Sequence, residues 1–463
     1  MTATRIANVG AQESTAIREL RESLFGELVL PGDERYDEAR QIHNPSIDRR
    51  PAMIVRAADS IDVTRAIEFA RSAGMQVAIR SGGHCLSGHS MIDDGMNIDL
   101  SGMKQVNVDQ ENRTAWVQPG ATTADLVAAI EPYGLALTTG DTATVGIGGL
   151  TLGGGIGWMV RKYGLTIDSL LSVEMVTAHG RLVTASKKEN PDLFWALRGG
   201  GGNFGIVTGF EFQLQQVGQV FGGVLILPAT REVLSGYASY APVAPDELTT
   251  ITMVMHLPPL PFVPEDYHGQ LAFVIFACYA GDPDAGQVAM TPLRKLAAPI
   301  AEILGPMPYS ALYNFTEIGA VPHDSTIRSG YLHELSGDVI DILLEHTTQN
   351  PMPMGLIQIR ALGGAFADVP CDATAFAHRD KKFLLALINI GTGEAVERWV
   401  IDLWERVGPS TEGAYVNFLD DEGEARVREA YSPEHVARLA AIKRQYDPEN
   451  VFNSNQNILP AEA

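Results

Sequence analysis

Arg80-Ser81-Gly82-Gly83-His84 is the first of two glycine-rich stretches that decide the fold, and it follows the strand-like run Gln76-Val77-Ala78-Ile79. The second stretch reads Val145-Gly146-Ile147-Gly148-Gly149, then Leu152-Gly153-Gly154-Gly155-Ile156-Gly157. Glycines this dense let backbone N–H groups approach a bound molecule closely, because no Cβ atom stands between them. We expect the two stretches to form a surface for a large, flat molecule that is anionic at one end, with His84 at its edge. The alternative is that the glycines only permit tight packing of strands.

Two better-known phosphate-binding loops do not fit the second stretch. The dinucleotide-binding pattern G-x-G-x-x-G requires a glycine at its sixth position, and the segment that begins at Gly146 has Thr151 there. A Walker A loop is absent from the sequence. The glycines therefore indicate a binding surface of another kind.

Composition and charge indicate an acidic globular protein. At 463 residues the chain is too long for one small hydrophobic core, so two domains are expected. The 34 Lys and Arg residues are outnumbered by 56 Asp and Glu, and the net charge of −22 argues against binding to nucleic acid. No apolar run is long enough to cross a bilayer, so we expect no membrane partner.

Cysteine usage and the N-terminus favour a cytoplasmic location. Met1-Thr2-Ala3-Thr4-Arg5 leads into no apolar segment of the kind that a secretory signal contains. Cys85, Cys278 and Cys371 are odd in number and far apart, and they form no C-x-x-C pair. We therefore expect neither a disulfide framework nor a metal site, and a reducing cytoplasm is the default compartment.

Hydrophobic periodicity divides the chain into two parts. Up to about residue 214 helices and strands alternate, with amphipathic helices predicted at Ser60–Gly74 and Thr123–Tyr133 and a third at Pro191, capped by Asn190. From Gly222 onward strand-like runs dominate. These runs are 224–227, 251–254, 273–276, 357–361 and 384–388, and the helical runs are 338–346, 395–407 and 433–445. The pattern predicts an α+β protein whose second domain is an antiparallel sheet covered on one side by helices.

The order of these motifs resembles, over nearly the whole chain, the vanillyl-alcohol-oxidase / berberine-bridge-enzyme-like flavoproteins, and within them the bacterial branch that includes 6-hydroxy-D-nicotine oxidase. The motifs are Asp48-Arg49-Arg50-Pro51-Ala52, the two glycine-rich stretches, Arg161-Lys162-Tyr163-Gly164-Leu165, Asn190 to Ala196, Gly200 to Thr208 and Tyr446 to Phe452. The resemblance implies a two-domain PCMH-type FAD-binding fold. It implies an FAD-binding domain at 16–220, a substrate-binding domain at 221–410 and a berberine-bridge-like segment at 411–460 that returns to the first domain.

His84 stands where the resemblance implies a covalent bond to the 8α-methyl group of FAD. An imidazole there withdraws electron density from the isoalloxazine, which makes the flavin a stronger hydride acceptor. Some family members carry a second bond, from a cysteine three residues before Val145, and this chain has Thr142 at that position. We therefore expect FAD to be attached monocovalently, through His84. The alternative is that His84 only shapes a turn. Its neighbour Cys85 is interpreted as a small packing residue.

The other cofactor contacts are also implied by the resemblance. They are Arg80, Ser81, Gly82, Gly83, His89, Ser90, Val145, Gly146, Gly148, Gly149, Gly153, Gly155, Gly157, Gly205, Ile206, Val207, Asn417 and Asn457. Val145 has an added implication, because a valine near the flavin C4a–N5 edge accompanies reactivity with oxygen in plant relatives. An ordinary strand valine is the alternative at this position.

Tyr415, Gln358 and Arg360 are the expected catalytic residues. Tyr415 and Asn417 would point the same way in a strand, and they resemble a family Tyr-x-Asn motif in which the tyrosine removes a proton from a substrate hydroxyl. A free tyrosine has a pKa near ~10, so it needs a positive or hydrogen-bonding neighbour to act at neutral pH. Gln358 and Arg360 alternate with apolar residues, which predicts a half-buried strand whose polar face covers flavin and substrate. The alternatives are that Tyr415 is only a half-buried tyrosine in a strand and that Arg360 only faces solvent.

The expected function is that of an FAD-dependent oxidase with two small partners, an organic substrate and dioxygen. A hydride passes from a small-molecule alcohol to flavin N5, and dioxygen then accepts the electrons and gives hydrogen peroxide. Oxidation of an amine, and oxygen insertion or cyclisation through a flavin–oxygen adduct, are alternatives within the same fold. A flavin-binding protein without turnover is a further alternative, and the Tyr-x-Asn motif and the polar strand argue against it.

Overall fold

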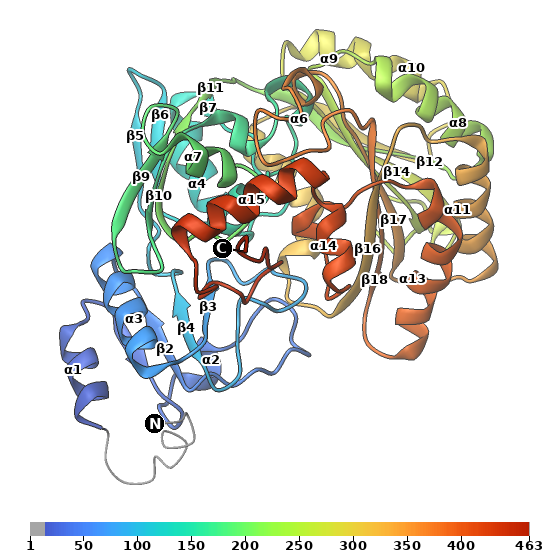
Figure 1. The fold of residues 1–463 in the computed structure, drawn as a ribbon. Helices are drawn as coiled ribbons and strands as arrows, with labels where there is room; N and C mark the ends of the chain where they lie inside the picture. The colour runs from blue at the N-terminus through green and yellow to red at the C-terminus, as the bar shows by residue number, and fades with distance from the viewer. Residues whose placement is uncertain (1–13, 463) are drawn as a thin grey trace.

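Three larger sheets form the framework of the protein, and a computed structural model describes residues 14–462 (Figure 1). The first sheet contains, in spatial order, β1 (Glu27–Val29), β2 (Met53–Arg56), β4 (Met96–Asp99) and β3 (Val77–Arg80). Its last three strands are parallel, so a crossover connection must join them. The stretch 1–5, on which the expected lack of a secretory signal rests, lies outside the described residues.

Helix α3 (Ser60–Ala73) makes the crossover from β2 to β3. The Asp59 side chain caps it by accepting hydrogen bonds from the backbone of Ile61 and Asp62, and Gly74 ends it in the left-handed conformation at φ 64°. Its apolar residues recur at helical spacing and are buried: Val63, Ala66, Ile67 and Ala70. The prediction of this helix is confirmed.

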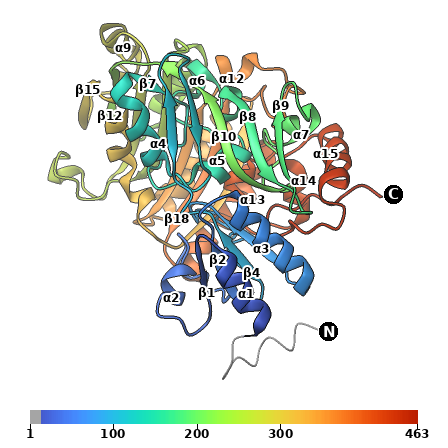
Figure 2. The same cartoon turned by 90° about the vertical axis from the view of Figure 1, so that its left-hand side faces the viewer.

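The second sheet is antiparallel and stands above the first in Figures 1 and 2. It contains, in spatial order, β5 (Val106–Asp109), β6 (Thr114–Val117), β10 (Ile206–Gln213), β8 (Leu170–Val176) and β9 (Leu182–Ser186). Helix α4 (Thr123–Ile130) begins with a capping box between Thr122 and Asp125, and a 3₁₀ turn, Glu131–Tyr133, extends it. The second predicted helix is therefore confirmed as well.

Helix α7 (Pro191–Ala196) begins where predicted, but Asn190 does not cap it. Asn190 has φ 46°, in the left-handed region, and makes no capping hydrogen bond. Its side-chain amide instead donates to the Thr184 carbonyl oxygen in β9, at 2.7 Å. The capping prediction is wrong because this side chain fastens the preceding turn to the sheet, while Pro191 starts the helix with its fixed φ.

The third sheet has seven antiparallel strands and comes from the second half of the chain. Its spatial order is β15 (Ala301–Met307), β12 (Val220–Pro228), β14 (Leu271–Tyr279), β13 (Leu248–His256), β17 (Gly355–Ala361), β18 (Phe383–Ile390) and β16 (Ser325–Leu332). Helices α8 (Arg231–Tyr240), α11 (Gly337–Gln349) and α13 (Glu394–Val407) cover one face (Figure 1). The predicted strand runs and the helical runs 338–346 and 395–407 lie in these elements, and the predicted α+β class is confirmed.

The C-terminal segment returns to the first half of the chain. Helix α15 (Pro433–Tyr446) lies beside α7 (Figure 1). Lys443, fully buried, pairs with Asp447 at 2.7 Å and donates to the Asn203 carbonyl oxygen at 2.8 Å. The domain boundaries at 16–220, 221–410 and 411–460 stay predictions.

The shorter elements connect these layers. They are α1 (Thr15–Ser23), α2 (Tyr36–Ala39), α5 (Ile147–Leu152), α6 (Val160–Tyr163), α9 (Pro283–Ala289), α10 (Thr291–Arg294), α12 (Ala365–Asp368), α14 (Glu424–Glu429) and the paired strands β7 (Leu135–Ala136) and β11 (Gln215–Gln216). Within residues 14–462, no helix combines the length and apolarity that a membrane span requires.

The two glycine-rich stretches contact each other through their backbones. A Cβ atom on Gly146 would lie 2.4 Å from the backbone nitrogen of Gly82. A Cβ atom on Gly157 would lie 1.4 Å from the carbonyl oxygen of Thr139. Both distances are far inside van der Waals contact, so tight packing of the chain explains these glycines. Gly149 differs, because it is exposed and nothing lies within 4 Å of its Cβ position.

Gly146→Ala and Gly149→Ala should therefore have opposite effects on stability. The methyl group on residue 146 forces two backbones apart, and overpacking of this kind costs about 1–3 kcal/mol. The methyl group on residue 149 meets open space inside a helix, where alanine is favoured over glycine. The free energies of unfolding of the two variants would be measured with a chemical denaturant. Equal stabilities would contradict the backbone contact.

Candidate active site

Tyr415 lies where the C-terminal segment meets the second glycine-rich stretch, and its side chain is buried. Its phenolic oxygen accepts hydrogen bonds from the backbone N–H groups of Gly155 at 3.1 Å and Ile156 at 3.3 Å. Asn417 Nδ2 donates to the same oxygen at 3.1 Å. Three donors on one oxygen stabilise negative charge at that atom. Only 2% of the Tyr415 surface is exposed, so the half-buried alternative for this tyrosine is wrong.

A turn, and not a strand, brings Tyr415 and Asn417 together. Val416–Phe418 form a 3₁₀ turn, so the prediction of a strand at this motif is wrong. The turn lays Asn417 against Gly153, where a Cβ atom would lie 2.0 Å from Asn417 Oδ1. The asparagine amide also donates to the Leu150 carbonyl oxygen at 3.1 Å. The segment curves because it follows the glycine-rich stretch instead of pairing with a sheet.

Arg360 is buried in the third sheet, with 4% of its surface exposed, so the solvent-facing alternative is wrong. Its Nη2 pairs with Asp141 Oδ2 at 2.8 Å, and its Nε donates to Gln358 Oε1 at 2.8 Å. The guanidinium lies 5.0 Å from the ring centroid of Phe418. All of β17 is buried, so the face that was expected to be half open is covered.

Opposing influences act on the pKa of Tyr415. Burial raises this pKa, and it outweighs the hydrogen bonds from Asn417, Gly155 and Ile156 and the positive charge of Arg360, which lower it. The net direction is upward, so Tyr415 is a neutral phenol near pH 7 in this structure. The Arg360 charge acts on the tyrosinate, and removing that charge would raise the pKa further.

His84 lies at the end of the first glycine-rich stretch, beside another histidine. Its Nε2 is 2.9 Å from Thr144 Oγ1, and its ring stacks on His43 with centroids 4.0 Å apart. Burial, together with the nearby His43 and His323, lowers the pKa of His84 to about 3. The imidazole is therefore neutral at pH 7 and keeps one unprotonated nitrogen, which is the nucleophilic form.

Several predicted cofactor contacts bond to the protein itself. Arg80 and Ser81 donate to backbone carbonyl oxygens at 2.7 and 2.6 Å. His89 Nδ1 lies 3.0 Å from Ser87 Oγ. These side chains hold the loop after β3 in place, so a ligand would meet mainly backbone there.

The remaining predicted residues supply backbone around these groups. Gly83, at φ 74°, turns the chain just before His84. Val145, Gly146 and Gly148 lead into and begin the short helix α5. The other three, Gly205, Ile206 and Val207, lie at the start of β10.

Two buried oxygens among the predicted contacts lack a hydrogen-bond partner within residues 14–462. They are Ser90 Oγ and Asn457 Oδ1. A buried polar atom without a partner costs free energy, so such atoms point to a bound group. Gly149 of the second glycine-rich stretch and Thr144, just before that stretch, are exposed. Open glycine backbone, unpaired oxygens and a neutral imidazole together fit an elongated polar cofactor such as FAD.

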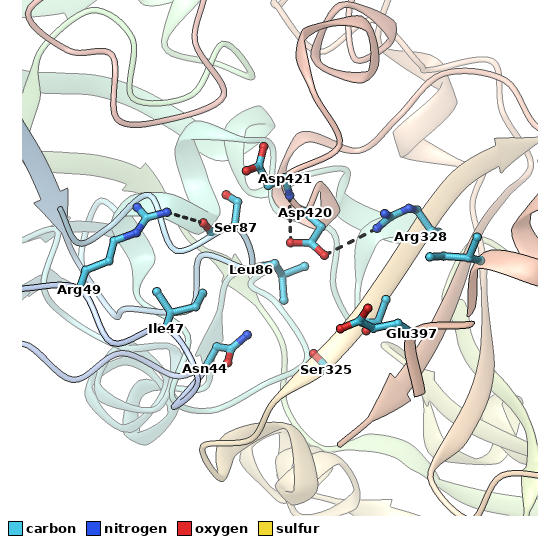
Figure 3. Close-up of a pocket in the computed structure, with 12 residues that line it drawn as sticks. Asn44, Ile47, Arg49, Leu86, Ser87, Ser325, Arg328, Glu397, Asp420 and Asp421 are labelled. Carbon is cyan, nitrogen blue, oxygen red and sulfur yellow. Dashed lines mark hydrogen bonds and ion pairs between the residues drawn. The ribbon is translucent and has the colours of Figure 1, made fainter. Parts of the chain in front are cut away.

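A groove of about 390 Å³ opens beside the histidines (Figure 3). Asn44, Leu86 and Ser325 line it, and each lies within two residues of His43, His84 or His323 in the sequence. Figure 3 shows one ion pair in the groove, between Arg328 and Asp420 at 3.6 Å. Arg49, which also lines the groove, donates to the backbone carbonyl oxygens of Gly88 and Met91.

Sequence reasoning missed four residues that shape this site: His43, Asp141, Thr144 and His323. Asp141 carried a usable signal, because it is a lone carboxylate in the otherwise uncharged segment 134–160. The other three belong to no glycine-rich or repeated motif. Their contacts join segments far apart in the sequence, so only the fold brings them to His84.

Comparison with known proteins agrees with this geometry. Residues 51–186 match the family described as FAD binding domain, and residues 414–459 match the family described as berberine and berberine like. The FAD-linked oxidoreductase YgaK of Bacillus subtilis (strain 168) is 34% identical over 451 residues, which cover 94% of this chain and 97% of the relative. The (R)-6-hydroxynicotine oxidase of Paenarthrobacter nicotinovorans is 30% identical over 461 residues, which cover 95% and 97%.

Solved structures share the whole fold. The 6-hydroxy-D-nicotine oxidase from Arthrobacter nicotinovorans superposes with a TM-score of 0.83 and 27% identity, over 95% of this chain and 99% of that one. The xylooligosaccharide oxidase from Myceliophthora thermophila C1 gives a TM-score of 0.85 and 26% identity, over 97% and 100%. The chain therefore belongs to the vanillyl-alcohol-oxidase / berberine-bridge-enzyme-like family of FAD-linked oxidoreductases.

Proposed function

We propose that the protein is an oxidase that removes a hydride from the hydroxyl-bearing carbon of a small molecule, with dioxygen as the final acceptor. The observation that carries this proposal is the Tyr415 oxygen, on which Gly155, Ile156 and Asn417 converge as donors. An alcohol must lose its hydroxyl proton as the hydride leaves, and a tyrosinate held by three donors is suited to accept it. FAD, when bound, takes the hydride and passes the electrons to dioxygen, giving hydrogen peroxide.

The cofactor would be held by the residues already described. The backbones of the two glycine-rich stretches and of residues 205–207 would contact FAD, and Ser90 and Asn457 would bond to it through their unpaired oxygens. His84 would hold the 8α-methyl carbon covalently. Val145 is proposed to lie near the edge of the flavin that reacts with oxygen.

Arg360 and Gln358, which lie in the third sheet, would influence the ionisation of Tyr415, the proton acceptor. The Arg360–Asp141 pair is buried, so its charges interact strongly with their surroundings. Gln358 Oε1 and Asp141 Oδ2 fix the guanidinium at two nitrogens, which leaves its direction little freedom. We propose that Arg360 makes the tyrosinate form of Tyr415 accessible in the working enzyme.

Oxidation of a C–N bond is the second candidate. The raised pKa of Tyr415 favours it, because a neutral amine can lose a hydride without a base. A 30% identical relative is named as a hydroxynicotine oxidase. Anaerobic reduction of the flavin by panels of alcohols and of amines separates the two candidates.

Tyr415→Phe should slow flavin reduction by an alcohol substrate about 10²- to 10⁴-fold, which is the usual contribution of a general base. FAD content should stay at the wild-type level, because the phenylalanine keeps the ring and loses only the oxygen. Stopped-flow absorbance under anaerobic conditions measures the reduction rate. An unchanged rate would remove the role of Tyr415 as base, and fast reduction by amines alone would favour the second candidate.

Arg360→Met should shift the pH dependence of that reduction rate to higher pH. Loss of the positive charge raises the pKa of Tyr415, so the tyrosinate forms only at more alkaline pH and the rising limb of the profile moves up. Arg360→Lys keeps the charge and is the matched control, with a rising limb close to that of the wild type. If both variants kept the wild-type pH profile, Arg360 would not influence the pKa of Tyr415.

A further inference from the structure

His84 is one of three imidazoles that lie together, and each comes from a different part of the chain. His43 precedes β2, His84 follows β3, and His323 precedes β16 of the third sheet. His43 stacks on His84 at 4.0 Å and meets His323 edge-on at 4.9 Å. Within residues 14–462, no three His, Cys, Asp or Glu side chains are arranged to hold a metal ion. The chemistry of this cluster is therefore that of the imidazoles themselves.

Backbone hydrogen bonds hold the cluster together. The His43 N–H donates to the Gly83 carbonyl oxygen at 3.0 Å, and the His323 N–H donates to the His43 carbonyl oxygen at 3.1 Å. Ser46 N–H donates to the Asp324 carboxylate at 2.8 Å. The stacked position of His43 over His84 is thus fixed from both sides.

Thr144 contacts one nitrogen of His84. Its Oγ1 lies 2.9 Å from His84 Nε2 and 3.5 Å from the carbonyl oxygen of Ala320. This contact occupies Nε2, so Nδ1 is the nitrogen of His84 that Thr144 leaves available for a further bond.

Both stacked rings are neutral at pH 7. Burial lowers the pKa of His43 to about 4, and the pKa of His84 falls to about 3. A protonated ring would lack the lone pair and would repel its neighbours. The cluster therefore keeps His84 in the form that can attack carbon.

We propose that Thr144 and His43 are positioning residues for the covalent attachment of FAD, and that they present Nδ1 of His84 to the 8-methyl carbon. This proposal rests on the His84 link proposed above. In the overall step one C–H bond of the methyl group and the N–H bond of the imidazole break, and one C–N bond forms. The two hydrogens and two electrons pass to dioxygen, which becomes hydrogen peroxide.

The segment just before strand β16 takes part in this arrangement. Ala320 and His323 belong to the segment that leads into β16, and they complete the contacts of Thr144 and His43. We expect attachment to proceed only after this segment has docked, and so only in the fully folded chain.

The test uses the full chain produced without flavin and then incubated with FAD in air. Intact mass, followed over time, reports covalent attachment, and flavin absorbance after gel filtration reports non-covalent binding. Thr144→Val and His43→Ala should bind FAD but gain its mass about tenfold or more slowly, as expected when one orienting contact is lost. Thr144→Ser keeps the hydroxyl and His43→Phe keeps the stacked ring, so both should attach FAD at close to the wild-type rate. His333→Ala, at an exposed histidine away from the cluster, is the control.

Two other outcomes would overturn the positioning roles, and a third would overturn the covalent link. Attachment at the wild-type rate in Thr144→Val and His43→Ala would overturn the positioning roles and leave the His84 link intact. Loss of non-covalent FAD binding in these variants would also overturn the positioning roles, because Thr144 and His43 would then be needed to form the FAD-binding site itself. A wild-type protein that binds FAD but never gains its mass would overturn the proposed link itself.

Discussion

The contact between the backbones of Gly82 and Gly146 is the constraint on which the rest of the site depends. Gly82 follows the first sheet, and Gly146 begins α5, so this contact sets the distance between two separate parts of the fold. His84 lies two residues beyond one glycine and Thr144 two residues before the other. The 2.9 Å approach of their side chains is a consequence of that contact. A side chain at either glycine would move His84 away from Thr144.

The polar groups of the site lie in places where isolated charges would be unstable. Arg360 and Asp141 are both largely buried, and each is stable there because the other is 2.8 Å away. Lys443 and Asp447 follow the same rule at the end of α15, where Lys443 also donates to the carbonyl oxygens of Asn203 and Phe452. This pair holds the C-terminal segment against the residues just before β10. The pKa of Tyr415 depends on the balance between its burial and its hydrogen-bond donors.

Local signals were sufficient to predict helices whose cap and apolar spacing lie in one segment. The helix at 60–73 has its cap, its apolar spacing and its terminal glycine in one continuous segment, and all three act over a few residues. Asn190 failed as a cap because a longer-range hydrogen bond to β9 competed for its side chain. Tyr415 and Asn417 kept the predicted proximity although the strand was wrong, because a 3₁₀ turn also brings their side chains together. The contacts of His84 with His43 and Thr144 could not be predicted, since no local pattern encodes contacts between distant segments.

The glycines also show why two interpretations of one motif are compatible. Gly146 and Gly157 are required by contacts within the protein, which agrees with the alternative that glycines here permit tight packing. Gly149, three residues after Gly146, has open space beside it and is free to receive a ligand. The sequence alone does not distinguish Gly149 from Gly146 and Gly157, and only their surroundings in the fold do. Tight packing at some glycines keeps the others rigidly open, so a binding surface of this kind needs glycines of both sorts.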